Sequence, residues 1–156
     1  MGFFDKSPAV AGGSPAPISR ERIKQTLESQ GWSYRVDPDG DISGGWEHGY
    51  FWFLLNGKQE EILIARGTWY PKLTPVELAL ASQVCEEWNR DRLWPKVYPR
   101  INDEGDLLLH AEHIVDYEHG LTDEQLLLHI GTAVNTGGQF FEHLNSVFPE
   151  AAAAQE

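Results

Sequence analysis

The 156-residue chain has few cysteines and no long apolar runs. Its single cysteine, Cys85, excludes an intramolecular disulfide, which is typical of cytoplasmic proteins. No apolar run reaches the roughly 18 residues that a transmembrane helix needs. The first residues also lack the basic segment and apolar stretch of a secretory signal. These absences predict a cytoplasmic protein that has no membrane as a partner.

Basic residues are scarce as well, because 12 Lys and Arg stand against 24 Asp and Glu, giving a formal net charge of −12. Nucleic acids and anionic membranes bind basic surfaces, so this balance argues against nucleic acid as a partner. Residues 76–156 hold only 4 basic residues and 15 acidic ones. Acidity often serves solubility alone, but this half could also attract a basic protein surface.

Motifs of enzymes and metal sites are missing too. HExxH, CxxC, GxSxG, P-loop and GxGxxG patterns do not occur. His110 and His113 lie three residues apart on a predicted strand, so their side chains point to opposite faces. His129 and His143 lie about four turns apart on a predicted helix, too far to share one ion. Residues 37–41 lack the glycine and glutamate spacing of an EF-hand loop. We therefore expect no catalytic residues, metal or cofactor.

The spacing of apolar residues predicts three helices. The longest covers 121–149, where Thr122 and Gln125 can form a capping box and one apolar stripe needs a large surface to cover. Two shorter helices are predicted over 19–30 and 75–92 from their caps and apolar stripes.

Alternating and apolar segments between the helices predict strands. A turn at 38–40 sets Val36 opposite Ile42, and the runs 50–55 and 61–69 form the next pair. The register of that pair stays open between loops of two and four residues.

A hairpin over 96–115 has its loop at 103–105, which sets Lys96 opposite Glu112 and Tyr98 opposite His110. Val97, Ile101, Leu107, Leu109 and Ala111 then share the apolar face.

These elements predict an α+β domain over residues 18–149, with two layers and the order α-β-β-β-α-β-β-α. Its strands are antiparallel because short turns join them. Residues 1–17 are rich in Pro, Gly, Ser and Ala, which predicts a flexible N-terminal lead. Residues 150–156 are predicted to form a flexible tail.

Two features are not explained by ordinary core packing. Gly137 and Gly138 fall inside the last helix, where each costs about 0.5–1 kcal/mol relative to alanine. A close neighbour or a kink would explain them. Six tryptophans are many for this length, and Trp and Tyr are favoured interface residues. The candidate partner-binding residues are Trp46, Trp52, Trp69, Trp94, Tyr98, Gly137 and Gly138.

The segment EWNRDRLWPKVY at 87–98, GLTDEQL at 120–126, and the pair Phe140 and Phe141 resemble the YbjN family of bacterial proteins, most of all its actinobacterial branch. The resemblance extends over 18–149. It implies a role in regulating sensory transduction and brings no catalytic residues. It also implies a fold similar to that of type III secretion chaperones, which are acidic, dimeric α+β proteins that bind extended segments of other proteins.

We therefore expect a non-enzymatic cytoplasmic protein-binding module, chaperone-like or regulatory, that forms a homodimer and binds a protein partner. A second hypothesis is a small-ligand sensor or enzyme. It places a pocket between the sheet and the last helix, with Tyr98, His110 and Glu112 as its polar groups. In a third hypothesis the aromatic residues only form the interface of a dimer.

Overall fold

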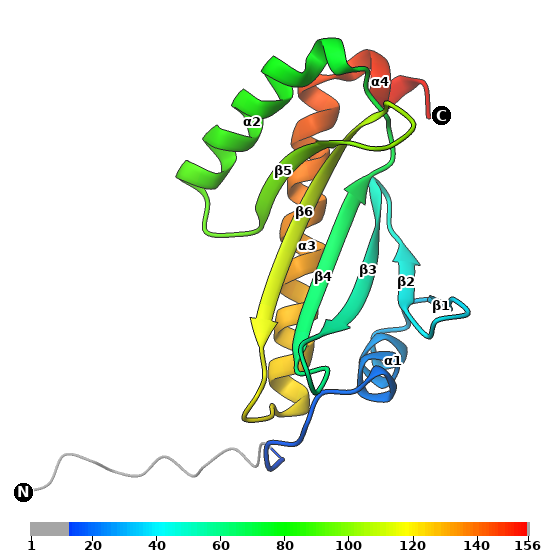
Figure 1. Cartoon of the computed structure of the whole chain (residues 1–156), viewed down its shortest axis with the longest axis vertical. Helices are drawn as coiled ribbons and strands as arrows, with labels where there is room; N and C mark the ends of the chain where they lie inside the picture. Colours follow the sequence, from blue (N-terminus) through cyan, green and yellow to red (C-terminus); the bar gives the residue numbers. More distant parts are fainter. Residues whose placement is uncertain (1–12, 156) are drawn as a thin grey trace, which may run out of the picture.

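The computed structural model describes residues 13–155, and its strands form one antiparallel sheet in the order β1-β2-β3-β4-β6-β5 (Figure 1). The strands are β1 (Arg35–Val36), β2 (Ile42–Gly45), β3 (Gly49–Asn56), β4 (Ile62–Trp69), β5 (Lys96–Ile101) and β6 (Leu107–Asp116). The helices are α1 (Arg20–Ser29), the 3-10 turn η1 (Pro75–Glu77), α2 (Leu78–Asp91), α3 (Asp123–Val147) and α4 (Pro149–Ala153). The predicted two-layer α+β class is confirmed. Four strands precede α2 instead of three, because the first hairpin contributes the two-residue strand β1.

The helices begin at the capping residues that the sequence predicts. The Ser19 side chain accepts a hydrogen bond from the Arg22 amide at the start of α1. Thr122 and Gln125 form the predicted capping box of α3. Gly31 has a φ of +69°, the left-handed conformation that commonly follows the end of a helix. These interactions are local, so the chain order alone determines them.

The two hairpin registers that the sequence predicted are both confirmed. Val36 lies opposite Ile42, and Tyr98 lies opposite His110. The pair that stayed open, β3 with β4, matches neither expected loop length. Its connection is the five-residue segment 57–61, which ends in Glu61.

This longer loop is possible because two of its residues adopt left-handed backbone conformations. Gly57 has a φ of +93° and Glu60 a φ of +56°, which is unusual for a residue with a side chain. The carboxylate of Glu61 accepts a hydrogen bond from the Gln59 amide across the loop.

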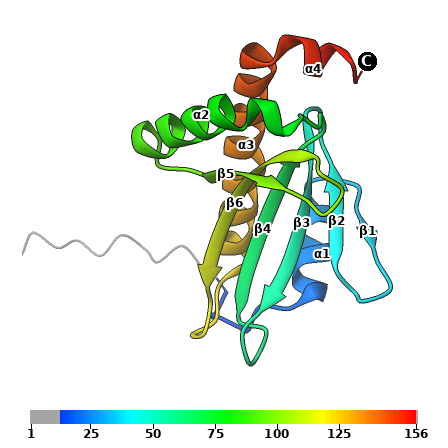
Figure 2. The ribbon, with the colours of Figure 1, turned by 45° about the horizontal axis from the view of Figure 1, so that its top comes forward.

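The core lies between one face of the sheet and α3, which runs behind the strands in both views (Figures 1 and 2). Helix α1 packs beside α3, and α2 contacts the edge strand β5. The core-facing residues of the central strands and of α3 are almost fully buried, among them Phe51, Phe53, Leu63, Leu109, Ala111, Ile130, Phe140 and Phe141.

Gly137 explains how α3 comes so close to the sheet. A Cβ on Gly137 would lie 2.6 Å from Cζ of Phe51, so the phenyl ring occupies the space of the missing side chain. A close neighbour therefore explains this glycine. Gly138 has open space around its Cβ position, so the two adjacent glycines differ in their surroundings.

Both predicted flexible segments contain some regular structure. Ala16 in the lead forms a bridge with Leu121, and residues 1–12 lie outside the described residues. The predicted tail begins within helix α4, and Phe148 before it is buried. Among residues 13–155, no helix has both the length and the apolar character needed to cross a membrane.

Candidate functional site

The face of the sheet that points away from α3 carries no helix among the described residues, and we call it the open face (Figure 2). Its side chains alternate along each strand with those of the core. The ones that matter below are Arg35, Ser43, Tyr50, Trp52, Leu54, Ile64, Arg66, Lys96, Tyr98, Arg100, Glu112 and Ile114. The run 50–55 thus has one covered face and one free face, although its apolar sequence is unbroken.

An apolar row crosses the middle of the open face. Leu54 on β3 lies opposite Ile64 on β4, which in turn lies opposite Ile114 on β6. Leu54 and Ile64 are half-buried by their neighbours, whereas the Ile114 side chain is 46% exposed. Trp52 lies one row further along on β3. Adjacent apolar side chains on an uncovered sheet surface are typical of a protein-binding site.

A buried carboxylate organises the polar side of the open face. Glu112 on β6 is only 5% exposed, although it lies on the face without helices. Its Oε2 accepts hydrogen bonds from Nε of Arg66 at 2.5 Å and from the Tyr98 hydroxyl at 2.7 Å. Its Oε1 lies 2.8 Å from Nζ of Lys96. One carboxylate therefore fixes two cations and a phenol.

These contacts shift the pKa of Glu112, Tyr98 and Arg66. Burial by itself would raise the pKa of the Glu112 carboxyl, but its three hydrogen bonds outweigh burial and lower that pKa to about 2. Burial and the bond to Glu112 raise the pKa of Tyr98 to about 12. The hydrogen bond to Glu112 raises the pKa of Arg66. Glu112 is therefore a charged structural anchor, because a general acid or base needs a pKa close to the working pH.

His110 lies beside this cluster. Its Nδ1 is 2.9 Å from the Thr68 hydroxyl, and its ring centroid is 5.2 Å from that of Tyr98. Burial lowers the pKa of His110, and the nearby Arg66 guanidinium lowers it further. The neutral ring is thus held in place as a packing partner for Tyr98.

A hollow of about 660 Å³ opens on the same face near β1 and β2. Its lining includes small residues, among them Ser43 and Gly45. The other lining residues supply aromatic rings and one cation, and they are Tyr34, Arg35, Tyr50, Trp52 and Tyr70. A depression lined by aromatic and small residues can receive a bulky apolar side chain of a partner.

The long edge of the sheet is closed to strand addition. The Asn89 side chain on α2 donates to the carbonyl oxygen of Val97 and accepts from its amide, each at 2.9 Å. Pro99, two residues further on β5, has no amide hydrogen to offer. An incoming strand would need these same backbone groups. Binding through the sheet is therefore directed to the open face.

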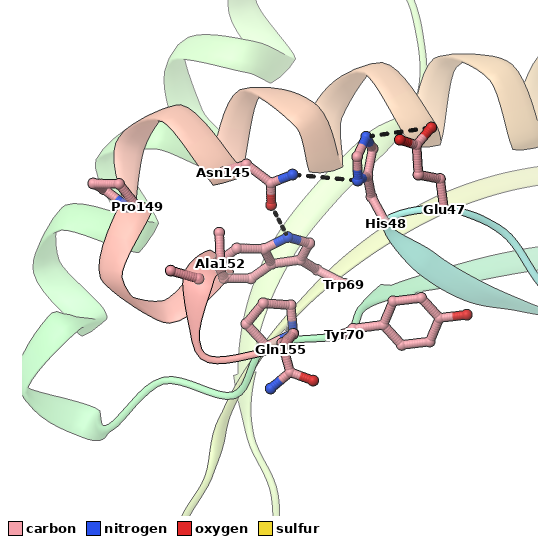
Figure 3. Close-up of a pocket in the computed structure, with 10 residues that line it drawn as sticks. Glu47, His48, Trp69, Tyr70, Asn145, Pro149, Ala152 and Gln155 are labelled. Atoms are coloured by element: carbon pink, nitrogen blue, oxygen red, sulfur yellow. Dashed lines mark hydrogen bonds and ion pairs between the residues drawn. The ribbon is translucent and has the colours of Figure 1, made fainter.

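A second depression, of about 700 Å³, lies between the loop that joins β2 to β3, the end of β4, the end of α3 and α4 (Figure 3). Asn145 accepts a hydrogen bond from Nε1 of Trp69 at 2.8 Å and contacts Nδ1 of His48 at 3.3 Å. Oε2 of Glu47 lies 3.9 Å from Nε2 of His48. Trp46 and Gly138 line an adjoining cavity of about 460 Å³. This depression contains no nucleophile paired with a base.

The predicted partner-binding residues are dispersed by the fold. Trp52 and Tyr98 belong to the open face, whereas Trp46 and Gly138 lie in the cavity beside α3. Trp94 is 49% exposed in the loop before β5, and its ring packs nearly perpendicular to that of His113, which lies on the core side.

Two of the predicted residues do not lie on a surface. Trp69 is 1% exposed, and Gly137 is buried under Phe51. We remove both from the candidate set, because the apolar side of β4 and the close approach of α3 require them in the core.

The expected pocket between the sheet and the last helix, with Tyr98, His110 and Glu112, is also wrong in its location. These three residues are close together, as expected, but they lie on the open face, on the side of the sheet opposite α3. Side chains at even positions of β6 point away from the helix layer, because Leu109 and Ala111 occupy the core side.

Arg35, Arg66, Ile64 and Ile114 were not predicted as site residues. The alternation in 61–69, where Ile62, Ile64 and Arg66 share one face, was visible in the sequence as a second apolar surface. Whether this face is exposed depends on which side of the sheet the helices cover, and the alternation in the sequence does not show which side that is.

Nucleophiles and metal ligands do not form a site in the described part of the chain. Cys85 is buried, and burial raises the pKa of its thiol to about 12. No group of three His, Cys, Asp or Glu residues within 13–155 could hold a metal ion.

Comparisons with known proteins agree with this fold. The model of the YbjN family, "Putative bacterial sensory transduction regulator", matches residues 19–146. The crystal structure of YbjN, "a putative transcription regulator from E. coli", superposes with a TM-score of 0.74 at 13% sequence identity, covering 85% of this chain and 95% of that one. At this identity the superposition shows a shared fold. No curated protein matches the chain.

Proposed function

We propose that this chain, which belongs to the YbjN family, is a non-enzymatic regulatory protein that binds another protein through its open face. The observation that carries this proposal is the uncovered apolar row beside an ordered polar cluster. The family is described as one of regulators, and a regulator of this size acts by contact with other molecules. We place this action in the cytoplasm, as the single cysteine suggests.

Ordering of the polar cluster supports this role. Arg66 and Lys96 have long side chains, and fixing them on binding costs roughly 0.5–1.5 kcal/mol for each. Glu112 restrains both before a partner arrives, because its carboxylate contacts each of them. The face is therefore partly preorganised, with apolar contacts in its middle and polar contacts at one side, as protein interfaces commonly are.

The experiment is affinity capture of the tagged chain from its native cells, with quantitative mass spectrometry, comparing the wild type with a Trp52→Asp, Ile114→Asp variant. We expect a partner that the wild type enriches and the variant loses at least tenfold. The matched control is Leu128→Asp, at an exposed position of α3 on the other side of the molecule. Equal capture by the wild type and the open-face variant would refute the proposal.

The homodimer expected from the resemblance is part of the proposal, and light scattering of the same proteins tests it. A wild-type dimer that becomes monomeric in the open-face variant would assign this face to self-association. A dimer in both would leave the open face available to a different protein.

A further inference from the structure

We propose that the segment bound by the open face is acidic and amphipathic, with carboxylates on the cations of this face and one bulky apolar side chain in the hollow. This inference rests on the proposed function of the same surface. It adds the chemistry of the partner, which the charges of the strands determine.

Three of the four cations, Arg35, Arg66 and Lys96, lie along one row that crosses all six strands. Successive pairing partners in the register are Arg35, Ser43, Trp52, Arg66, Glu112 and Lys96. Neighbouring strands are about 4.8 Å apart, so the row spans roughly 24 Å. A segment lying across the strands would meet a cation near each end of this row, a tryptophan, and a further cation between them.

The open face is basic within an acidic protein. Its strands carry four basic residues, Arg35, Arg66, Lys96 and Arg100, and two acidic ones, Glu112 and Asp116. The whole chain has 12 basic and 24 acidic residues. The remaining surface therefore repels an acidic segment, and the open face attracts it, so the electrostatic field favours one landing site.

Internal carboxylates do not neutralise all the cations of the open face, so positive charge remains to attract a partner. Glu112 contacts both Arg66 and Lys96, so one negative charge faces two positive ones. Arg35 and Arg100 have no carboxylate within 4.0 Å among residues 13–155. An arginine that is already exposed and unpaired binds an incoming carboxylate without first breaking an internal ion pair.

The hollow lies at the Arg35 end of the row. Arg35 and Trp52 both line it, so a carboxylate on Arg35 and an apolar side chain between the rings are neighbouring contacts. Tyr50 and Tyr70, with ring centroids 6.0 Å apart, form another part of its wall. A segment that alternates acidic and bulky apolar residues fits both features.

Two other occupants fit the charges less well. A nucleic acid needs many phosphate contacts, and four cations on a chain of net charge −12 offer few. A second copy bound through the same face would set two basic surfaces against each other, because a two-fold dimer pairs a surface with itself. The acidic segment avoids both penalties.

The experiment selects binders from a phage-displayed library of random 16-residue peptides, and measures the selected peptides by fluorescence polarisation. We expect peptides rich in Asp and Glu with at least one aromatic residue. Arg35→Glu and Arg100→Glu should each weaken binding about five- to tenfold and reduce its salt dependence. The matched control Lys58→Glu, in the exposed loop between β3 and β4, should change affinity less than twofold.

The Ser43→Trp variant separates the two proposals, because it replaces a small lining residue of the hollow with a bulky one without changing charge. If the selected peptides are neutral or basic and lose binding in Ser43→Trp, the proposal of an acidic partner is wrong, but the open face remains the binding site. If their binding survives both Ser43→Trp and the Trp52→Asp, Ile114→Asp variant, the acidic partner and the open-face binding site are both wrong. A labelled 16-nucleotide oligothymidylate is measured in the same assay. If it binds more tightly than every selected peptide, the proposal of an acidic peptide partner is wrong and a nucleic acid is favoured. A library that yields no binder would also overturn it.

Discussion

The ring of Phe51 on β3 occupies the place that a side chain at Gly137 on α3 would take, with Cζ 2.6 Å from the ideal Cβ position. Helix and sheet therefore meet through a phenyl ring against bare backbone. Phe51 also contacts Phe141, whose ring centroid is 5.9 Å away, so the ring has little room to move. The glycine sets how deeply α3 lies on the sheet.

Gly137→Ala should therefore destabilise the protein. Alanine improves helix propensity by about 1 kcal/mol, but overpacking against a confined ring costs about 1–3 kcal/mol. We expect a net loss of about 1 kcal/mol in urea unfolding. Gly138→Ala is the matched control, because its Cβ meets nothing within 4 Å, and it should stabilise by up to about 1 kcal/mol. Equal effects of the two substitutions would contradict this account of Phe51.

Glu112 makes the free energy of unfolding depend on pH in the acidic range. Its pKa is about 2 in the folded chain and 4.5 ordinarily, so the stability it contributes is complete above pH 4.5 and is lost as the pH falls towards 2. Glu112→Gln cannot titrate and should lose roughly 2 kcal/mol at pH 7, with a smaller difference from wild type at pH 3. Unfolding by urea at pH 7, 5 and 3 measures this. A constant difference between the two proteins at every pH would show that the carboxylate charge is not the cause.

Asn89 protects the edge of the sheet. Replacing it with alanine removes both hydrogen bonds to the backbone of Val97 and should cost about 1–2 kcal/mol. The Val97 amide should then exchange with solvent faster, which hydrogen–deuterium exchange by NMR would show. Gln83→Ala, on the same helix but bonded only to the Glu87 side chain, is the control and should change neither quantity. Unaltered exchange at Val97 in Asn89→Ala would mean that another group covers this edge.

His113 opposes folding when protonated. Burial lowers its pKa, and the neighbouring His129 lowers it further, so stability should fall as the pH drops below the ordinary value of 6.5. Its buried Nε2 also has no hydrogen-bond partner among the described residues. His113→Leu should raise the free energy of unfolding by about 1 kcal/mol and reduce its pH dependence between pH 7 and 5.

The control for His113 is His119→Leu, at a side chain that is 91% exposed, and it should keep the wild-type stability within about 0.5 kcal/mol. The measurement is urea unfolding at pH 7, 6 and 5. His110, whose pKa burial also lowers, should leave a smaller pH dependence in His113→Leu. A pH dependence as steep as that of the wild type would assign the effect to a group other than His113.

The sequence by itself determined the features that depend on neighbours along the chain. Ser19, Thr122 and Gly31 act at helix ends, and the loop at 103–105 aligns two strands whose alternation agrees in only one register. Because each of these interactions spans few residues, its geometry follows from residue type and spacing. The α+β class was predictable for the same reason, because it follows from the order of helices and strands along the chain.

Only the tertiary structure decided which surface is free. A strand places alternate residues on two faces, but the pattern does not say which face the helices will cover. Trp52 and Trp69 looked alike in the sequence, and one lies on the open face while the other lies in the core. The row from Arg35 to Lys96 joins residues from six strands, so it exists only once packing has fixed the order of the sheet. Contacts between residues so far apart in the chain depend on the fold as a whole, which local spacing does not encode.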